Sequence, residues 1–431
     1  MATSVDLGRL SARQAAQHIR QGELSAEDMV QACLARIEAR EGTIRAWSAV
    51  NPDAALAQAQ ALDRRGSSAG PLHGVPLGVK DVFDTYDLPT EHGSPIYQGW
   101  QPMGDAACVA AARAAGAVIL GKTHTAEFAN LHPPPTRNPH NPAHTPGGSS
   151  SGSAAAVADF MVPLALGTQT GGSTVRPASF CGIVGFKPSF GEISRAGLKL
   201  SAESLDTVGL FGRDVGDVAL LAHVLYSLNP VIRLQRPPRV ALFRTPRWSR
   251  VQPAMQHGIE HAAQCFASAG AQVVELDAGA QFEELFEAHA CIMRYEIARG
   301  MVWETQVHRN RYSDIYREKV DAGLVTTRAQ WRDALAVRAH WQTWMAQSMQ
   351  AFDLLLTAPA ADEAPVGLTS TGDSSFNGIW TALGVPCLNL PNTRGPQGLP
   401  LGVQLVAANG ADELLLQGAL WAERALAERS S

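Results

Sequence analysis

The sequence has no cysteine pattern of the kind that marks a disulfide framework or a zinc site. None of its cysteines belongs to a Cys-x-x-Cys pair. In a chain of this length, isolated cysteines are typical of small buried thiols. The six are Cys33, Cys108, Cys181, Cys265, Cys291 and Cys387. We therefore expect neither structural disulfides nor a bound metal.

Long hydrophobic runs and clusters of basic residues are also missing. No stretch of about 18 apolar residues occurs, which excludes a membrane-spanning helix. The first residues, MATSVDLGRLSARQAAQHIRQGELS, contain neither the apolar core nor the cleavage pattern of a secretory signal. The 35 basic and 40 acidic residues give a net charge of −5, and no Lys/Arg run suggests a surface for nucleic acid. We therefore expect a cytoplasmic protein that binds neither membranes nor nucleic acids.

What the sequence does contain is enough apolar material for a large packed core. Hydrophobic residues make up 45% of the 431 residues and charged residues 17%. No internal repeat occurs, and no linker rich in Pro, Gly and Ser joins two self-sufficient halves. We therefore predict one large domain over residues 1–431, of a size that is typical of enzymes.

Residues 1–65 are predicted to form helices that pack on this domain. The segment SARQ (11–14) has the form of a capping box, and SAED (25–28) resembles one less closely. A stripe of apolar side chains at helical spacing follows, which indicates a surface helix packed on a core. The stripe consists of Met29, Ala32, Cys33, Ile37 and Ala39.

The next part of the sequence alternates between strand-like and helix-like segments. Short apolar runs bounded by Gly or Pro, at 74–84, 115–123 and 161–170, indicate buried strands. The alanine-rich segments 105–116 and 152–160 between them favour helices. This alternation predicts an α/β fold with a largely buried sheet.

Further strands are predicted closer to the C-terminus, at 238–243, 271–276, 352–359 and 400–408. Residues 281–350 lack strand-like runs and are rich in Ala, Glu, Arg and Trp, so we predict a helical layer there. The strands from both ends of the chain are expected to share one large mixed sheet that is covered by helices on both faces.

Two short motifs match well-known patterns but lack the required context. GAVILGKT (116–123) matches the P-loop expression, yet its variable residues look like the strand itself and not like an open phosphate-binding loop. GSSSG (148–152) matches a nucleophile elbow centred on Ser150. The preceding segment RNPHNPAHTPGG contains three prolines and cannot be a central strand. We therefore give little weight to either motif.

A third set of residues suggests serine chemistry. Lys80 stands in the apolar stretch VPLGVKDVF, and a desolvated lysine loses its proton easily and can act as a base. Ser149 belongs to the serine loop PGGSSSGSAAA (146–156). Ser173 follows two glycines, which can aim backbone N–H groups at one point, as in an oxyanion hole. The alternatives are a lysine stem packed on apolar surface and an ordinary strand-ending turn.

Longer motifs carry a family resemblance over residues 74–212, and STGDSSFNGIWTALGVPCLNLP (370–391) continues it more thinly. They are HGVPLGVKD (73–81), GKTHTAEFA (121–129), NPHNPAHTPGGSSSGSAAAVA (138–158), LGTQTGGSTVRPASFCGIVGFKPS (166–189) and SLDTVGLFGR (204–213). In these motifs the sequence resembles the amidase signature family, hydrolases that use a Ser–cisSer–Lys triad. Within that family, GGSSSGS, TQTGGS-x-x-RPA and SLDTVGLFG look more like malonamidase and related small bacterial amidases than like the A subunits of transamidosomes.

The resemblance implies a role for each residue of the third set. Ser173 is the nucleophile, Lys80 is the base, and Ser149 bridges them, held in a cis peptide with Gly148. The backbone N–H groups of Thr170, Gly171, Gly172 and Ser173 form the oxyanion hole. The serine loop is then a catalytic loop and not a flexible linker.

The resemblance also points to substrate-binding residues. Gln169 stands where many members have aspartate, and Ser151 where many have glycine. Arg176 lies one place later than the arginine of many members, and in malonamidase-like members that place can bind an acidic substrate; a structural ion pair is the alternative. Leu131, in the proline-rich segment ANLHPPPT (129–136), is expected to help to shape the acyl pocket.

The family resemblance implies a serine amidohydrolase that cleaves amide-type C–N bonds through an acyl-enzyme, without metal or organic cofactor. The expected substrates are small-molecule amides, anilides, esters and carbamates, which includes urethanase and aryl acylamidase activity. We expect a monomer or homodimer. One alternative is the A-type component of a glutamine amidotransferase, which works in a complex with a tRNA-binding partner. Another is a non-catalytic binding protein with the same fold.

Overall fold

The computed structural model describes residues 7–66 and 70–428, and its centre is one sheet of eleven strands. The strand order is β1-β3-β2-β4-β6-β5-β10-β11-β9-β7-β8. The strands are β1 (Trp47–Val50), β2 (Pro76–Lys80), β3 (Val118–Thr123), β4 (Leu164–Gln169), β5 (Val184–Lys187), β6 (Thr207–Gly212), β7 (Arg239–Phe243), β8 (Gln272–Leu276), β9 (Leu354–Thr357), β10 (Cys387–Arg394) and β11 (Pro400–Val406). The predicted α/β fold with one large mixed sheet is confirmed.

Parallel pairing occurs in two parts of the sheet. Strand β2 runs parallel to both β3 and β4, and β7 runs parallel to both β8 and β9. The other neighbouring strands are antiparallel. Because parallel strands end at the same edge of a sheet, Lys80 at the end of β2 lies close to the end of β4.

Helices cover both faces of the sheet, and the strands are apolar on both sides. In β9, Leu354 and Leu356 pack into one core cluster and Leu355 into another, as expected when successive side chains point to opposite faces. One face carries α5 (Ala107–Ala114), α8 (Val215–Tyr226), α9 (Pro253–Ser268) and α15 (Asp412–Ala427). The other carries α3 (Ala26–Ile44), α4 (Pro52–Arg65), α6 (Ser151–Ala158), α7 (Val175–Cys181) and α14 (Ser375–Leu383).

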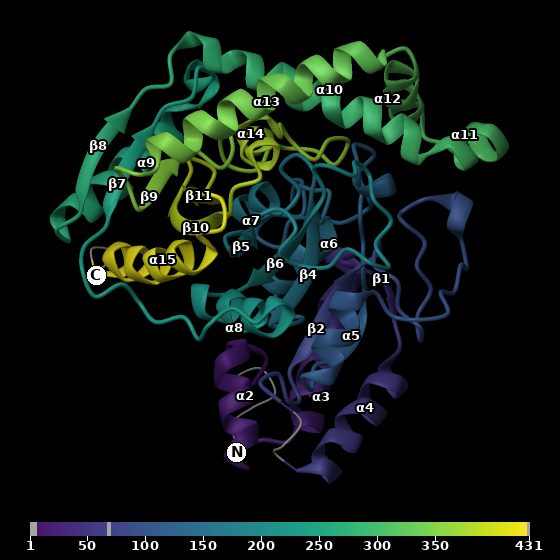
Figure 1. Cartoon of the computed structure of the whole chain (residues 1–431). Helices are drawn as coiled ribbons and strands as arrows, with labels where there is room; N and C mark the ends of the chain where they lie inside the picture. Colours follow the sequence, from purple (N-terminus) through teal and green to yellow (C-terminus); the bar gives the residue numbers. More distant parts are fainter. Residues whose placement is uncertain (1–6, 67–69, 429–431) are drawn as a thin grey trace.

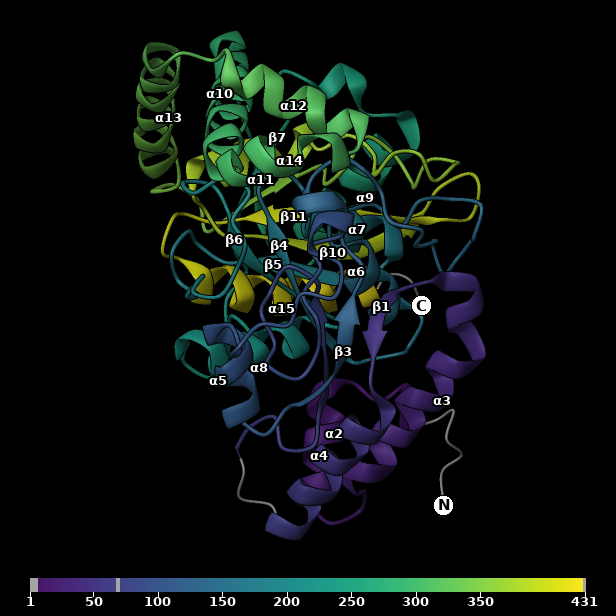
Figure 2. The same ribbon diagram turned by 90° about the vertical axis from the view of Figure 1, so that its right-hand side faces the viewer.

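Residues 281–350 form a set of helices at one end of the molecule. They are α10 (Glu283–Gly300), α11 (Val302–His308), α12 (Asp314–Leu324) and α13 (Arg328–Ser348). Figure 1 and Figure 2 show α10, α12 and α13 at the end opposite to the N-terminal helices α2 (Ala12–Arg20), α3 and α4. Helix α14 packs against α10 and α13, so this group also reaches the sheet.

The N-terminal segment differs in one respect from the prediction of helices alone. Both capping boxes are present, with Ser11 and Gln14 at α2 and Ser25 and Asp28 at α3. However, strand β1 interrupts the helices and pairs antiparallel with β3. Trp47 and Val50 favour a strand at this sheet edge, and the all-helix prediction for residues 1–65 was wrong here. Residues 1–6 lie outside the described part of the chain.

Candidate active site

Strand β2 carries Lys80 into the interior beside the serine loop. Lys80 is fully buried, and its Nζ donates to Ser149 Oγ at 2.9 Å and to Thr168 Oγ1 at 2.6 Å. Thr168 comes from β4, the parallel neighbour of β2. The structure therefore brings Lys80 and Ser149 together, and it adds a hydroxyl from β4 that the sequence had not singled out.

The serine loop is packed firmly against the protein. Its peptide between Gly148 and Ser149 is cis, and the carbonyl of Ser149 accepts a hydrogen bond of 3.0 Å from Ala126 N–H. Ser151 Oγ donates to the carbonyl of Gly147 at 2.7 Å, and Ser150 Oγ lies 3.3 Å from both backbone polar atoms of Thr168. These contacts describe a fixed loop and not a flexible linker.

Ser173 lies in the turn between β4 and α7 and is 7% exposed. In the part of the chain that the structure describes, no hydrogen bond joins Ser173 Oγ to Ser149 Oγ. The structure thus joins two members of the predicted triad directly and places the third at the neighbouring strand end. The last six residues of the P-loop motif form strand β3, where Lys122 Nζ lies 3.0 Å from the carboxylate of Asp81, so the motif has no loop to hold a phosphate.

The carbonyl oxygens of the three residues before Ser173 each accept a hydrogen bond. The carbonyl of Thr170 lies 2.9 Å from His289 Nε2, that of Gly171 accepts from Thr381 Oγ1 at 3.0 Å, and that of Gly172 accepts from Arg176 N–H at 3.0 Å. In a trans peptide, the N–H of the next residue points away from the carbonyl. Among the described residues, no protein acceptor takes up the N–H groups of Gly171, Gly172 and Ser173. Three consecutive donors therefore have no acceptor among the described residues, which is one requirement of an oxyanion hole.

The electrostatic surroundings favour a neutral Lys80. Burial lowers the pKa of Lys80 to about 7, while the carboxylate of Asp206 acts in the opposite direction. Burial also raises the pKa of Asp206 to about 6, although this carboxylate accepts hydrogen bonds from Thr170 Oγ1 and from the N–H of Ala202. An amine with a pKa near 7 can accept and return a proton at neutral pH.

The three predicted substrate-binding residues lie in different environments. Arg176 Nη2 donates to the carbonyl of Gly148 at 2.6 Å and to Thr371 Oγ1 at 3.1 Å. In the described ranges, Arg176 forms no ion pair, and its buried Nε and Nη1 have no hydrogen-bond partner. Arg176 thus holds the serine loop through the carbonyl of Gly148 and not through an ion pair, and the carboxylate of Asp373 acts on its charge without direct contact, so a structural role stands beside substrate binding. Burial lowers the pKa of this guanidinium to about 10.

Gln169 and Leu131 are placed less favourably for contact with a substrate. The side chain of Gln169 is buried and accepts the N–H groups of Thr174 and Val175, so it caps the start of α7. Leu131 is 39% exposed and lies beside a groove of about 800 Å³. Among the residues that line this groove are His132, Pro133, Tyr312, Ile315, Leu368 and Thr369.

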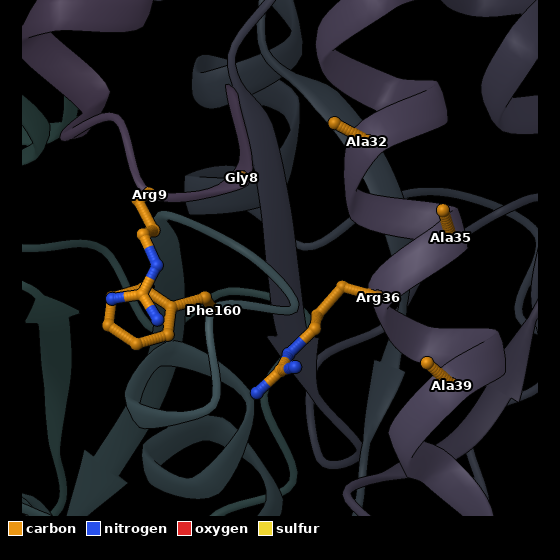
Figure 3. A pocket seen from close by; sticks show the side chains of 7 residues that line it. All are labelled: Gly8, Arg9, Ala32, Ala35, Arg36, Ala39 and Phe160. Atoms are coloured by element: carbon orange, nitrogen blue, oxygen red, sulfur yellow. The ribbon is translucent and has the colours of Figure 1, made fainter. Parts of the chain in front are cut away.

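A second cavity, of about 200 Å³, lies away from all of these residues. Figure 3 shows it between α3 and the segment around Gly8, with Arg9 over the ring of Phe160 and Arg36 on the opposite side. Arg36 Nη2 is already bonded to Asp159 Oδ1 at 2.8 Å. No residue of the predicted triad lines this cavity.

Sequence reasoning did not find Thr168, His289 or Thr381. Thr168 could have been found, because pairing β2 with β4 places a β4 hydroxyl beside Lys80. His289 and Thr381 contact Thr170 and Gly171, which lie 119 and 210 positions earlier in the sequence. No local sequence pattern predicts contacts over such distances along the chain. Within the described residues, no group of three or more His, Cys, Asp or Glu side chains could hold a metal, and no helix is long and apolar enough to cross a membrane.

Comparisons with known proteins place this site in a family context. The sequence model of the family described as Amidase matches residues 28–416. Several curated relatives are A-type components of glutamyl-tRNA(Gln) amidotransferases. The one from Thermobifida fusca (strain YX) is 39% identical over 353 residues, which is 75% of this chain and 70% of that protein.

Solved structures of similar fold include two amidases. One, described as "Crystal structure of amidase", has a TM-score of 0.89 and 30% identity, with 97% of this chain and 100% of that chain covered. The native peptide amidase from Stenotrophomonas maltophilia has a TM-score of 0.83 and 28% identity, with 97% of each chain covered. The similarity therefore extends over nearly the whole length of each chain.

Proposed function

The chain belongs to the amidase family, and from this membership we propose that it hydrolyses amide-type C–N bonds through an acyl-enzyme on Ser173. The proposal rests above all on one observation. The buried amine of Lys80 is hydrogen-bonded to Ser149 Oγ, and the three unpaired N–H groups before and at Ser173 lie on the neighbouring strand end. A base, a relay and an anion-binding turn are the parts that serine-dependent acyl transfer needs.

The reaction proceeds in two steps. Neutral Lys80 takes the proton of Ser149 as Ser149 takes that of Ser173, and Ser173 Oγ forms a bond to the substrate carbonyl carbon. The carbonyl oxygen becomes negatively charged and binds the N–H groups of Gly171, Gly172 and Ser173. The C–N bond then breaks, and the proton returns through the same relay to the leaving nitrogen. Water repeats the sequence and releases the acid.

This relay requires a contact between Ser173 Oγ and Ser149 Oγ that is not among the hydrogen bonds of the described residues. Ser173 Oγ must come within hydrogen-bonding distance of Ser149 Oγ when the substrate binds. Catalytic hydrogen bonds are often long or misaligned before the substrate is present and tighten in the complex. Ser173 is 7% exposed, whereas Lys80 is fully buried, so the proposed nucleophile is the more accessible of the two.

The second candidate function is that of the A-type component of a glutamine amidotransferase, which the curated relatives favour. Those relatives are named as components of glutamyl-tRNA(Gln) amidotransferases. Both functions share the cleavage of an amide C–N bond, and they differ in whether the released ammonia passes to a partner. Both kinds of relative resemble this chain over nearly its full length, so coverage does not distinguish the two functions.

Arg176 favours a substrate with a hydrogen-bond acceptor near the reacting carbonyl. It is the second residue of α7, three positions after Ser173, and two of its buried nitrogens have no partner in the described part of the chain. Unpaired buried N–H groups are costly, so an acceptor on the substrate would be bound there with a favourable free energy. A carboxylate or the second oxygen of a carbamate provides such an acceptor.

The purified chain, without any partner protein, is expected to release nitroaniline, ammonia or phenol from a panel of aryl anilides, primary amides and aryl carbamates. The panel includes free glutamine. Turnover of an anilide or carbamate supports the hydrolase. Turnover of glutamine alone, or no turnover until a second protein is added, supports the amidotransferase component.

Activity is expected to depend on the protonation of Lys80. Since burial lowers the pKa of Lys80 to about 7, the amine is protonated below that pH and cannot act as a base. The value of kcat/KM should therefore rise as the pH passes through about 7 and level off above it. A rate that falls over the same range, or one that rises only near pH 10, would contradict the assignment.

A further inference from the structure

Helix α10 reaches the anion-binding turn through one side chain. His289 is buried, and its Nε2 lies 2.9 Å from the carbonyl oxygen of Thr170. A carbonyl oxygen only accepts hydrogen bonds, so Nε2 carries the proton. Burial lowers the pKa of His289 to about 4, which leaves the ring neutral at physiological pH. His289 is therefore a fixed, uncharged donor.

The neighbouring residues leave room for this ring and for little else. A Cβ at Gly378 would come within 2.8 Å of His289 Cε1 and Nδ1, which is too close for any side chain there. Gly378 belongs to α14, which packs against α10. Glycine at this position therefore allows the imidazole to lie between α14 and the turn.

The hydrogen bond from His289 to the carbonyl of Thr170 determines the direction of the Gly171 N–H. The carbonyl of Thr170 and the N–H of Gly171 belong to the same planar peptide and point in opposite directions. When His289 holds the carbonyl, the N–H of Gly171 must face away from α10. Thr381 Oγ1 does the same for the next peptide by donating to the carbonyl of Gly171 at 3.0 Å.

We propose that His289 is a positioning residue of the active site, which orients the Gly171 N–H toward the oxyanion by holding the opposite side of its peptide. This rests on the proposed function, because the oxyanion arises in that reaction. His289 touches neither the substrate nor Ser173 Oγ in this role. Its effect appears where negative charge develops, in the transition state and not in the bound substrate.

Two substitutions of His289 distinguish the effect of losing its hydrogen-bond donor from the effect of changing the side-chain volume. His289→Gln places an amide N–H near the former Nε2, whereas His289→Leu fills the space without a donor. We expect His289→Leu to lower kcat by about 10- to 100-fold, because a misdirected donor is worth less than the 10²–10³-fold of a deleted one. KM should change by less than about threefold, and His289→Gln should recover most of kcat. The exposed His257, changed to Leu and to Gln, is the matched control.

A transition-state mimic tests the mechanism without turnover. An aryl trifluoromethyl ketone forms a tetrahedral oxyanion on Ser173, so its affinity should fall in His289→Leu by the same factor as kcat/KM. Should the leucine variant fail to fold, His289→Met takes its place. Thermal unfolding of each variant shows whether the fold is intact.

Three results are distinguishable. If wild-type activity does not depend on Ser173, the proposed function fails and the role of His289 with it. If it does depend on Ser173 but His289→Leu keeps kcat and the affinity for the ketone, only the role of His289 is overturned. Equal losses in the Leu and Gln variants would also overturn it, because the donor would then not be the cause.

Discussion

Substitution of Ser173 by alanine is expected to lower amide hydrolysis by at least about 10⁴-fold, to the level of residual catalysis by binding alone. The reason is that no acyl-enzyme can form without the Oγ. The backbone N–H groups at the turn remain, so substrate binding should persist. Turnover of the best panel substrate measures the loss, and thermal unfolding should show a midpoint close to that of the wild type.

Ser150→Ala is the matched control for this experiment. Ser150 is the serine of the rejected nucleophile elbow, and among the described residues its Oγ forms hydrogen bonds with the backbone of Thr168 alone. Covalent labelling with a phosphonofluoridate followed by mass spectrometry should place the label on Ser173 in the wild type and in Ser150→Ala. Label on Ser150, or normal turnover in Ser173→Ala, would show that the nucleophile has been assigned wrongly.

Replacing Lys80 with methionine is expected to lower turnover by about 10²- to 10⁴-fold, the usual contribution of a general base. Methionine has a similar length and no ionisable group, so the relay through Ser149 loses its proton acceptor. The remaining activity should also lose the rise in rate near pH 7, because the group that titrates there is gone. A pH profile of the variant beside that of the wild type measures both effects.

Lys122→Met provides the contrast for Lys80. Lys122 is just as buried, but its Nζ lies 3.0 Å from Asp81 Oδ1. Removing it leaves a buried carboxylate without its partner, which is strongly destabilising. We therefore expect Lys122→Met to lower the midpoint of thermal unfolding, and Lys80→Met to lower turnover with the fold retained. The opposite outcome would make Lys80 a structural residue and Lys122 a candidate for the chemistry.

Much of the sheet could be predicted from short apolar runs. The predicted runs at 74–84, 115–123 and 161–170 contain β2, β3 and β4, and four further runs contain β7, β8, β9 and β11. Strands β5, β6 and β10 were not predicted from periodicity. Strand β5 has only four residues, and proline and asparagine stand within β10, so a rule based on apolar, β-branched runs does not find these two. Glycine does not explain the missed β6, because β2, β3 and β4 contain glycine too.

The order of the strands could not be predicted from the sequence. Strand β6 pairs with β4 and β5, and β10 pairs with β5 across about 200 residues. Such pairings depend on which faces bury one another and leave no local signal. The same holds for His289, whose contact with Thr170 depends on how α10 lies over the turn.

The site residues could be proposed from sequence because they stand in three dense motifs. Lys80, Ser149 and Ser173 were singled out as a lysine in an apolar run and serines beside glycines. The hydrogen bond between Lys80 and Ser149 is what the structure adds. Roles for the three residues stay proposals until the variants are measured, as does the likeness to malonamidase.

All six cysteines are free and buried, so the rate at which they react with a thiol reagent would measure how often the protein opens. Burial raises the pKa of Cys33 and Cys108 to about 12, and thiolates are the reactive form toward thiol reagents. A coloured thiol reagent should therefore react with the native protein only as fast as segments open. Following the released product over time would give the summed opening rates of the segments that bury these thiols, without an engineered label.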